Sequence, residues 1–186
     1  MKYEAIVSKQ ASAMKAFFEK NQDELERSFA EVAARLEQGK KILVFGNGGS
    51  AAQAQHFASE MVNRFQKPRT GIPALSLASD PASLTSIAND TSFEEVFSRQ
   101  IEALGSPGDV VLALSTSGKS PNVLQALKKA REKGLFTIAL TGEAGVQEGN
   151  PVDILLAVPS METPRIQEGH LLVLHLLAEE VEERLF

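Results

Sequence analysis

Cysteine is absent from this chain of 186 residues. Disulfide bonds and thiolate metal sites are therefore excluded. The chain also lacks a cluster of lysine and arginine, and its 24 acidic residues outnumber its 19 basic residues. Nucleic acid is therefore not an expected ligand, because its recognition requires a concentrated basic surface.

Long apolar runs are lacking as well. Residues 1–10 carry charges and contain no apolar stretch of signal-peptide length. The longest later run, Leu171–Ala178, is interrupted by His175 and is too short to cross a membrane. We therefore expect a cytoplasmic protein without membrane contacts. The hydrophobic content of 43% and the charged content of 23% are ordinary for a globular protein, and the length suits one domain over residues 1–186.

Short apolar runs alternate with segments of helical periodicity. Strands are predicted at 42–45, 73–78, 110–114, 135–140 and 152–158. Helices are predicted directly after the first strand and at about 93–104, 121–133 and 164–183, while 79–81 and 89–91 are interpreted as breaks. Strands that are apolar throughout and alternate with helices indicate a parallel sheet covered on both faces. The predicted fold class is therefore α/β, with five parallel strands.

An amphipathic segment precedes the first strand. Apolar side chains recur with helical periodicity over residues 3–38, and Gly39 ends the pattern. This predicts one long helix or two shorter ones. Such a helix has much apolar surface, so it would either pack in a homo-oligomer or fold back on its own domain.

Two loops rich in glycine and serine follow predicted strands. In the first loop, Gly48 and Gly49 permit positive φ and close approach of a ligand, and Ser50 is a suitable N-cap for the next helix. The second loop, 115–120, places four hydroxyl groups at the start of another helix. Helix N-termini favour anions such as phosphate, and ligands of parallel sheets bind at the carboxyl ends of strands. Either loop alone is also compatible with a turn that binds nothing, but two neighbouring loops of this kind favour a phosphate-bearing ligand.

Neither loop matches a nucleotide-binding motif. The spacing Gly46-x-Gly48-x-x-Ala51 fits a dinucleotide fingerprint, but the second predicted strand does not supply an acidic residue about 20 positions later. The sequence Gly118-Lys119-Ser120 is similar to the end of a P-loop, but Ala113 stands where that motif requires glycine.

Histidine and glutamate occur together on the helix after the first strand. His56 and Glu60 are four residues apart, so they share one face of that helix. A carboxylate and an imidazole are suited to proton transfer. With one or two further nitrogen or oxygen ligands, they are also suited to holding zinc.

The last helix offers further candidates. His170 and His175 both stand in an otherwise apolar stretch, and only one of them can face a given site. Around the helix, Glu168 lies about 20° and Gln167 about 80° from His175. Helical geometry alone favours Glu168 as the partner of His175, but it does not settle the choice.

Five motifs, taken together and in order, resemble the phosphoheptose isomerase family of sugar isomerase (SIS) domains. They are Gly46-Asn47-Gly48-Gly49-Ser50-Ala51, His56-x-x-x-Glu60, Asn89-Asp90, Ser115-Thr116-Ser117-Gly118-x-Ser120 and Arg165-Ile166-Gln167-Glu168-x-His170-x-x-x-x-His175. The resemblance implies a single SIS domain with a flavodoxin-like sheet, in a homotetramer with sites at subunit interfaces. It also implies an aldose-ketose isomerase that converts D-sedoheptulose 7-phosphate to D-glycero-D-manno-heptose 7-phosphate. The product would enter bacterial heptose synthesis for the lipopolysaccharide core or a surface layer.

The resemblance further implies roles for individual residues. The implied substrate contacts are Asn47, Gly48, Gly49, Glu60, Asn89, Asp90, Ser115, Thr116, Ser117, Ser120 and Gln167. The implied zinc ligands are His56, Glu60, Gln167 and His175, so the family rather than the helical geometry selects Gln167 over Glu168. Glu60 and His175 are the implied catalytic residues. Lys119 stands where the family more often has asparagine, so it either adds a cation near the phosphate or points to water.

The implied reaction fits these groups. Moving a carbonyl from C2 to C1 requires removal of a proton from the adjacent carbon, a cis-enediolate and return of the proton. A carboxylate can carry the proton, while a metal ion or an imidazolium stabilises the oxyanion. A glutamate bound tightly to zinc is a weak base. Either the metal holds Glu60 loosely, or His175 performs more of the proton transfer.

The shared motifs are also compatible with two other functions. A non-enzymatic SIS protein that binds the bacterial replication initiator DnaA shares the Asn-Gly-Gly-Ser turn and a segment like Asn63-Arg64-Phe65. That group lacks the carboxylate and the imidazole that this chain has at Glu60 and His175, so the resemblance favours the isomerase. The third possibility is a sugar-phosphate sensor without turnover.

Overall fold

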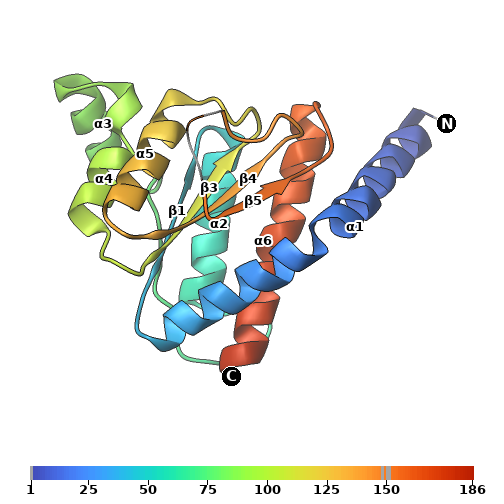
Figure 1. The fold of residues 1–186 in the computed structure, drawn as a ribbon, viewed down its shortest axis with the longest axis horizontal. Coiled ribbons are helices and arrows are strands. Elements are labelled where there is room, and N and C mark those ends of the chain that lie inside the picture. The colour runs from blue at the N-terminus through green and yellow to red at the C-terminus, as the bar shows by residue number, and fades with distance from the viewer. Residues whose placement is uncertain (1, 148, 150–151) are drawn as a thin grey trace.

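One parallel sheet with helices on both faces forms the centre of the molecule (Figure 1). The computed structural model describes residues 2–147, 149 and 152–186. The strands are β1 (Ile42–Gly46), β2 (Ala74–Ser76), β3 (Val110–Ser115), β4 (Phe136–Thr141) and β5 (Ile154–Ala157). They lie in the order β2-β1-β3-β4-β5, and every pairing is parallel. The predicted five-stranded parallel sheet is confirmed.

The sheet divides the core into two layers, each covered by helices. The helices are α1 (Lys2–Glu37), α2 (Gly49–Val62), α3 (Pro81–Asp90), α4 (Ser98–Leu104), α5 (Pro121–Glu132) and α6 (Thr163–Leu185), and η1 (Phe93–Glu95) is a short 3-10 turn. Alternate residues of a strand face opposite sides of a sheet. Ile42 and Val44 accordingly pack in the core with α1, α2 and α6, whereas Leu43 and Phe45 pack with α4 and α5. Because both faces of the central strands are covered, β1, β3 and β4 are buried at every position.

The strand order reverses between β1 and β3. The chain leaves β1 toward α2 on one face of the sheet and leaves β3 toward α5 on the other face (Figure 1). The loops 47–48 and 116–120 therefore flank the crevice where ligands of such sheets bind.

The amphipathic N-terminal segment is one helix with a bend. The backbone of Asn21 departs from helical geometry, and its side-chain amide donates to the carbonyl of Phe17 at 2.8 Å. The second half of α1 folds back on its own domain, where Phe29 and Val32 are buried. The first turns extend beyond the body of the molecule (Figure 1), with Tyr3 77% and Val7 68% exposed.

Two local predictions are wrong, and one helix is missing from the prediction. The break at residues 79–81 leads directly into α3, which Asp80 caps by accepting from the N–H of Ala82 at 2.9 Å. The predicted helix 93–104 consists of η1 followed by the shorter α4. Ser50 is not an N-cap: α2 begins earlier, after Gly48 at φ 55°, a conformation that favours glycine, and Ser50 is buried in the first turn.

None of the helices in the described ranges is long and apolar enough to cross a bilayer.

Candidate active site

His56 of α2 and His175 of α6 meet although they are 119 residues apart in the sequence. Their Nε2 atoms are 2.9 Å apart, so one nitrogen carries a proton and the other accepts it. The Nδ1 atom of His56 lies 3.7 Å from Oε1 of Glu60, one turn further along α2. The two helices thus bring the predicted base and the predicted imidazole to one place, with His56 between them.

The surroundings of His175 favour its neutral form. Burial lowers the pKa of His175, electrostatic repulsion between two protonated imidazoles would lower it further, and the Glu60 carboxylate opposes both effects. The Phe65 ring packs over His175, with the two ring centroids 5.6 Å apart. A neutral imidazole can both accept and donate a proton near neutral pH.

His170 is directed away from this pair. It is completely buried, and its Nε2 donates to the Thr141 carbonyl of β4 at 3.1 Å. Burial lowers the pKa of His170 to about 4, against a smaller raising effect of that hydrogen bond. As predicted, only one histidine of α6 faces the candidate site.

Gln167 and Glu168 have different partners. Glu168 forms an ion pair with Arg165 at the exposed side of α6, instead of the partnership with His175 that helical geometry favours. The Gln167 amide lies against the glycine turn between β1 and α2, formed by Gly48 and Gly49. A Cβ placed on Gly49 would be 2.5 Å from the Nε2 of Gln167. Gln53 of α2 holds this segment by donating to the Gln167 carbonyl at 2.7 Å.

The loop 115–120 is preorganised by its own hydrogen bonds. Ser115 Oγ accepts from the N–H of Gly118 at 3.2 Å and lies 3.4 Å from Ser120 Oγ. The backbone of Ser120 starts α5, since its carbonyl accepts from Val123 and Leu124. Gly118 has φ 63° and a Cβ there would lie 1.7 Å from the carbonyl oxygen of Gly145, so the loop needs glycine at this position.

An asparagine pair joins the two loops. Asn47 and Asn122 exchange two side-chain hydrogen bonds of 2.9 Å each. This fixes the β1–α2 loop against the start of α5 across the crevice.

Asn89 and Asp90 lie apart from the histidine pair within one copy of the chain. They end α3, which lies on the side of the molecule opposite α6 (Figure 1). Both are exposed, and the Asn89 amide donates to the Asp90 carboxylate at 2.8 Å.

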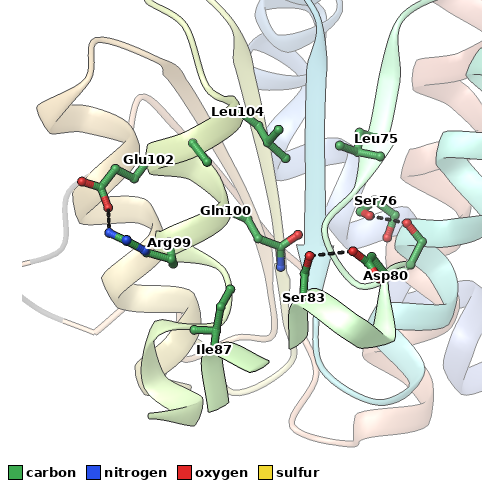
Figure 2. Close-up of a pocket in the computed structure, with 11 residues that line it drawn as sticks. Leu75, Ser76, Asp80, Ser83, Ile87, Arg99, Gln100, Glu102 and Leu104 are labelled. Carbon is green, nitrogen blue, oxygen red and sulfur yellow. Dashed lines mark hydrogen bonds and ion pairs between the residues drawn. The ribbon is translucent and has the colours of Figure 1, made fainter. Parts of the chain in front are cut away.

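A hollow of about 630 Å³ between β2, α3 and α4 is lined by none of the predicted site residues. Figure 2 shows that its charged groups are already paired: Arg99 donates to Glu102 at 2.8 Å, and Asp80 accepts from the Ser83 hydroxyl at 2.6 Å. The hollow therefore offers little free acid or base.

Sequence reasoning missed two residues beside the site. Gln53, His56 and Glu60 have the spacing i, i+3 and i+7, so the shared helix face could have identified Gln53. Asn122 had no comparable signal, because its partner Asn47 lies 75 positions away.

Metal binding would depend on the donors around His56. Within residues 2–147, 149 and 152–186, no group of three or more His, Cys, Asp or Glu side chains is arranged to hold a metal ion. Of the predicted zinc ligands, α2 supplies His56 and Glu60, and α6 supplies Gln167 and His175.

Comparisons with known proteins cover nearly the whole chain. The SIS domain family model matches residues 7–142. The phosphoheptose isomerase of Trichlorobacter lovleyi is 48% identical over 98% of this chain and 95% of its own length. That of Geobacter sulfurreducens is 54% identical over 86% of this chain and 85% of its own length. The solved structure of a phosphoheptose isomerase from Francisella tularensis superposes with a TM-score of 0.93 at 34% identity, covering 98% of this chain and 97% of that one.

Proposed function

This chain belongs to the phosphoheptose isomerases of the SIS-domain family, and we propose that it isomerises D-sedoheptulose 7-phosphate to D-glycero-D-manno-heptose 7-phosphate. The observation that carries the proposal is the meeting of Glu60 and His175 around His56, beside loops suited to a phosphorylated sugar. The relatives give no support to the alternative of a DnaA-binding protein. The product would serve bacterial heptose synthesis in the cytoplasm.

The loop 115–120 is the proposed phosphate site. Its hydroxyls from Ser115, Thr116, Ser117 and Ser120 and the N-terminus of α5 provide donors for an anion. Asn47, Gly48 and Gly49 lie on the other side of the crevice, where the β1–α2 turn can contact the sugar hydroxyls. Gln167 lies against that turn and would contact the same part of the substrate.

Glu60 and His175 are the proposed proton carriers. Glu60 removes the proton from C1 of the ketose, which leaves a cis-enediolate, and returns a proton to C2. His175, kept neutral by its lowered pKa, moves the hydroxyl proton between the oxygens of C1 and C2. The C–H bond at C1 and the O–H bond of its oxygen break, and a C–H bond at C2 and an O–H bond of its oxygen form. No other reactant is therefore needed.

Zinc is the proposed metal because of the donor types at this site, although no three of the described His, Asp or Glu side chains are arranged around one point. His56, Glu60, Gln167 and His175 would hold the ion, because two imidazoles, a carboxylate and an amide oxygen form a nitrogen and oxygen set that zinc accepts. A bound zinc ion would polarise the substrate carbonyl and stabilise the negative charge that develops on it. Glu60 lies 3.7 Å from Nδ1 of His56, and a loosely held carboxylate would keep enough basicity for proton transfer.

A homotetramer with sites at subunit interfaces is the proposed assembly. Two features support it: the first turns of α1 extend away from the body with exposed apolar side chains, and His56 is partly exposed. Asn89 and Asp90 are remote from the histidine pair of their own copy, so they would reach the substrate of a neighbouring copy.

A panel of ketose phosphates tests the function. The purified protein is incubated with pentulose, hexulose and heptulose phosphates, and aldose phosphates are detected by NMR. We expect turnover of sedoheptulose 7-phosphate, with exchange of the C2 proton with solvent. Absence of turnover for every seven-carbon ketose phosphate, with and without added zinc, would refute the proposal.

A further inference from the structure

Glu182 is a buried carboxylate that the proposed chemistry does not use. It lies on α6 with its side chain 2% exposed, and it accepts four hydrogen bonds from the segment after α2. Its Oε1 accepts from the N–H of Phe65 at 3.0 Å, and its Oε2 accepts from the N–H groups of Gln66 and Lys67, both at 2.7 Å. Arg69 supplies the fourth hydrogen bond through Nε at 2.7 Å. A carboxylate with every oxygen satisfied in this way fixes the turn that binds it.

Arg69 connects this carboxylate to the end of α2. Its side chain is fully buried, and its two terminal nitrogens donate to the carbonyls of Glu60 at 2.8 Å and Met61 at 2.9 Å. These carbonyls belong to the last turn of α2, where a cation also interacts favourably with the helix dipole. The guanidinium therefore holds the backbone of the residue whose side chain is the proposed base.

The same contacts position the Phe65 ring against His175. Glu182 binds the backbone of Phe65, and the Phe65 ring packs on the His175 ring. Glu182 also follows His175 by two helical turns, so both side chains project from one face of α6 toward the segment 60–69. One end of the network thus holds Glu60 of α2, and the other end holds Phe65 against His175 of α6.

We infer that Arg69 and Glu182 are positioning residues that set the placement of Glu60 relative to His175. The inference rests on the proposed function for the roles of those two groups. Neither positioning residue touches the substrate loops, so the pair acts on the chemical step and leaves binding of the sugar phosphate nearly unchanged.

The Glu182 carboxylate is stabilised in its ionised form, as expected of a fixed hydrogen-bond acceptor. Burial alone would raise the pKa of Glu182, but the hydrogen bonds from Lys67, Gln66, Phe65 and Arg69 outweigh it and lower the pKa to about 2. The carboxylate is therefore ionised throughout the range in which the enzyme would work. Replacement by the neutral amide would place N–H donors against the N–H groups that the carboxylate now binds.

Glu182→Gln and Arg69→Lys test the inference, with Asp109→Asn as the matched control. Asp109 is another buried carboxylate, which accepts from Lys41 Nζ at 2.5 Å and from the N–H of Ser106 at 2.8 Å, at the starts of β1 and β3. Two measurements are made on each folded protein: kcat and KM for the sugar phosphate, and the imidazole C–H signals of metal-free protein by NMR at pH 8. The chain has three histidines, so the signals of His175 can be assigned with single variants.

We expect kcat to fall roughly tenfold to a hundredfold in Glu182→Gln, with KM within about twofold, because small misplacements of catalytic groups slow the chemical step. The His175 signals should shift as the Phe65 ring moves, and Asp109→Asn should change neither quantity. Arg69→Lys keeps the positive charge but loses the two hydrogen bonds to the carbonyls of Glu60 and Met61. If Glu182→Gln does not fold, the test of the inference rests on Arg69→Lys. Unshifted His175 signals in a folded variant would overturn the inference, whether or not the protein has isomerase activity. A wild-type protein without isomerase activity would refute the proposed function only, since the NMR comparison is independent of turnover.

Discussion

His170 and His175 lie five positions apart on α6, yet their environments differ completely. His170 is buried against β4 and neutral, while His175 faces His56 and Phe65 at the candidate site. The same contrast applies to Gln167, which lies against the glycine turn, and Glu168, which pairs with Arg165. A side chain's role in this helix therefore depends on what it packs against.

His170 makes stability dependent on pH. Its pKa is about 4 in the folded chain, compared with an ordinary histidine value of 6.5. The unfolded chain therefore takes up a proton first as pH falls, and stability is lost from about pH 6.5 downward. We expect the free energy of unfolding to fall by about 2 kcal/mol between pH 8 and pH 5 from this group. Urea unfolding at both pH values, at one protein concentration, measures the effect.

His170→Gln is the control for this prediction, because glutamine does not titrate. In that variant the loss between pH 8 and pH 5 should shrink by about 2 kcal/mol, even though the variant is less stable at pH 8. The lowered pKa of His175 contributes a remaining loss in the same pH range. Glu182 and Asp109 have lowered pKa values, so their contributions disappear only at lower pH. An unchanged pH dependence in His170→Gln would contradict the assignment.

Glu60→Gln should abolish isomerisation while leaving substrate binding largely intact. Loss of a general base lowers kcat by roughly a hundredfold to ten-thousandfold. The dissociation constant for the sugar phosphate, measured by calorimetry, should stay within a few fold. Glu168→Gln is the matched control, since its exposed ion pair with Arg165 lies outside the site, and it should keep kcat within about twofold. Equal losses in the two variants would remove the case for Glu60 as the base.

At the scale of elements, the loops at the carboxyl ends of β1 and β3 are held by the chain around them. The asparagine pair joins them to each other, and the 142–146 segment packs against the β3–α5 loop. Gly118 lies at that contact, where its N–H donates to the Ser115 carbonyl and its own carbonyl accepts from Gln147. The loop therefore keeps its shape before any ligand arrives.

Gly118→Ala should damage this loop. The added Cβ would lie 1.7 Å from the Gly145 carbonyl oxygen, so one of the two segments must move. We expect KM for the sugar phosphate to rise about tenfold or more, because the hydroxyls of the proposed phosphate site would no longer converge. Steady-state kinetics by an NMR or coupled assay measures this change.

Gly39→Ala is the control that separates the effect of the steric clash at Gly118 from the effect of backbone strain. Gly39 also has positive φ, at 75°, but nothing lies within 4 Å of a Cβ there. This variant should cost about 1–2 kcal/mol of stability and leave KM within about twofold. A similar rise of KM in both variants would show that strain, and not displacement of the loop, is responsible.

At the scale of the whole molecule, contacts within one copy of the chain do not account for the apolar side chains at the start of α1. Its second half completes the core beneath the sheet, whereas Tyr3, Ile6 and Val7 are exposed on a helix that leaves the body (Figure 1). Apolar side chains on a projecting helix favour packing against another copy.

Charges on this part of α1 should therefore disrupt the assembly. Tyr3→Glu with Val7→Glu is expected to shift the protein from the proposed tetramer to smaller species in light scattering coupled to size exclusion. Activity should fall in parallel, because the proposed sites lie between copies. Leu104→Glu is the control: it changes a side chain that is 42% exposed on α4, on the other side of the sheet, and should leave the assembly intact. A tetramer that survives both α1 charges would contradict the role of this helix.

Much of this protein could be predicted from the order of its residues. The apolar runs predicted the five strands, and the absence of cysteine limited a metal site to nitrogen and oxygen donors. The pairing of His56 and Glu60 on one face followed from their spacing. These features depend on neighbours within a few positions, so the geometry of one strand or helix is sufficient to predict them.

Only the tertiary structure decided which groups meet. It brought His175 to His56 across 119 positions, directed His170 into the core, placed Gln167 on the glycine turn, and joined Arg69 to Glu182 across 113 positions. Such contacts depend on how α2 and α6 pack against the same face of the sheet. Side-chain packing between elements carries no periodic signal in the sequence, so helical geometry alone favoured Glu168 over Gln167 and left the histidine unassigned.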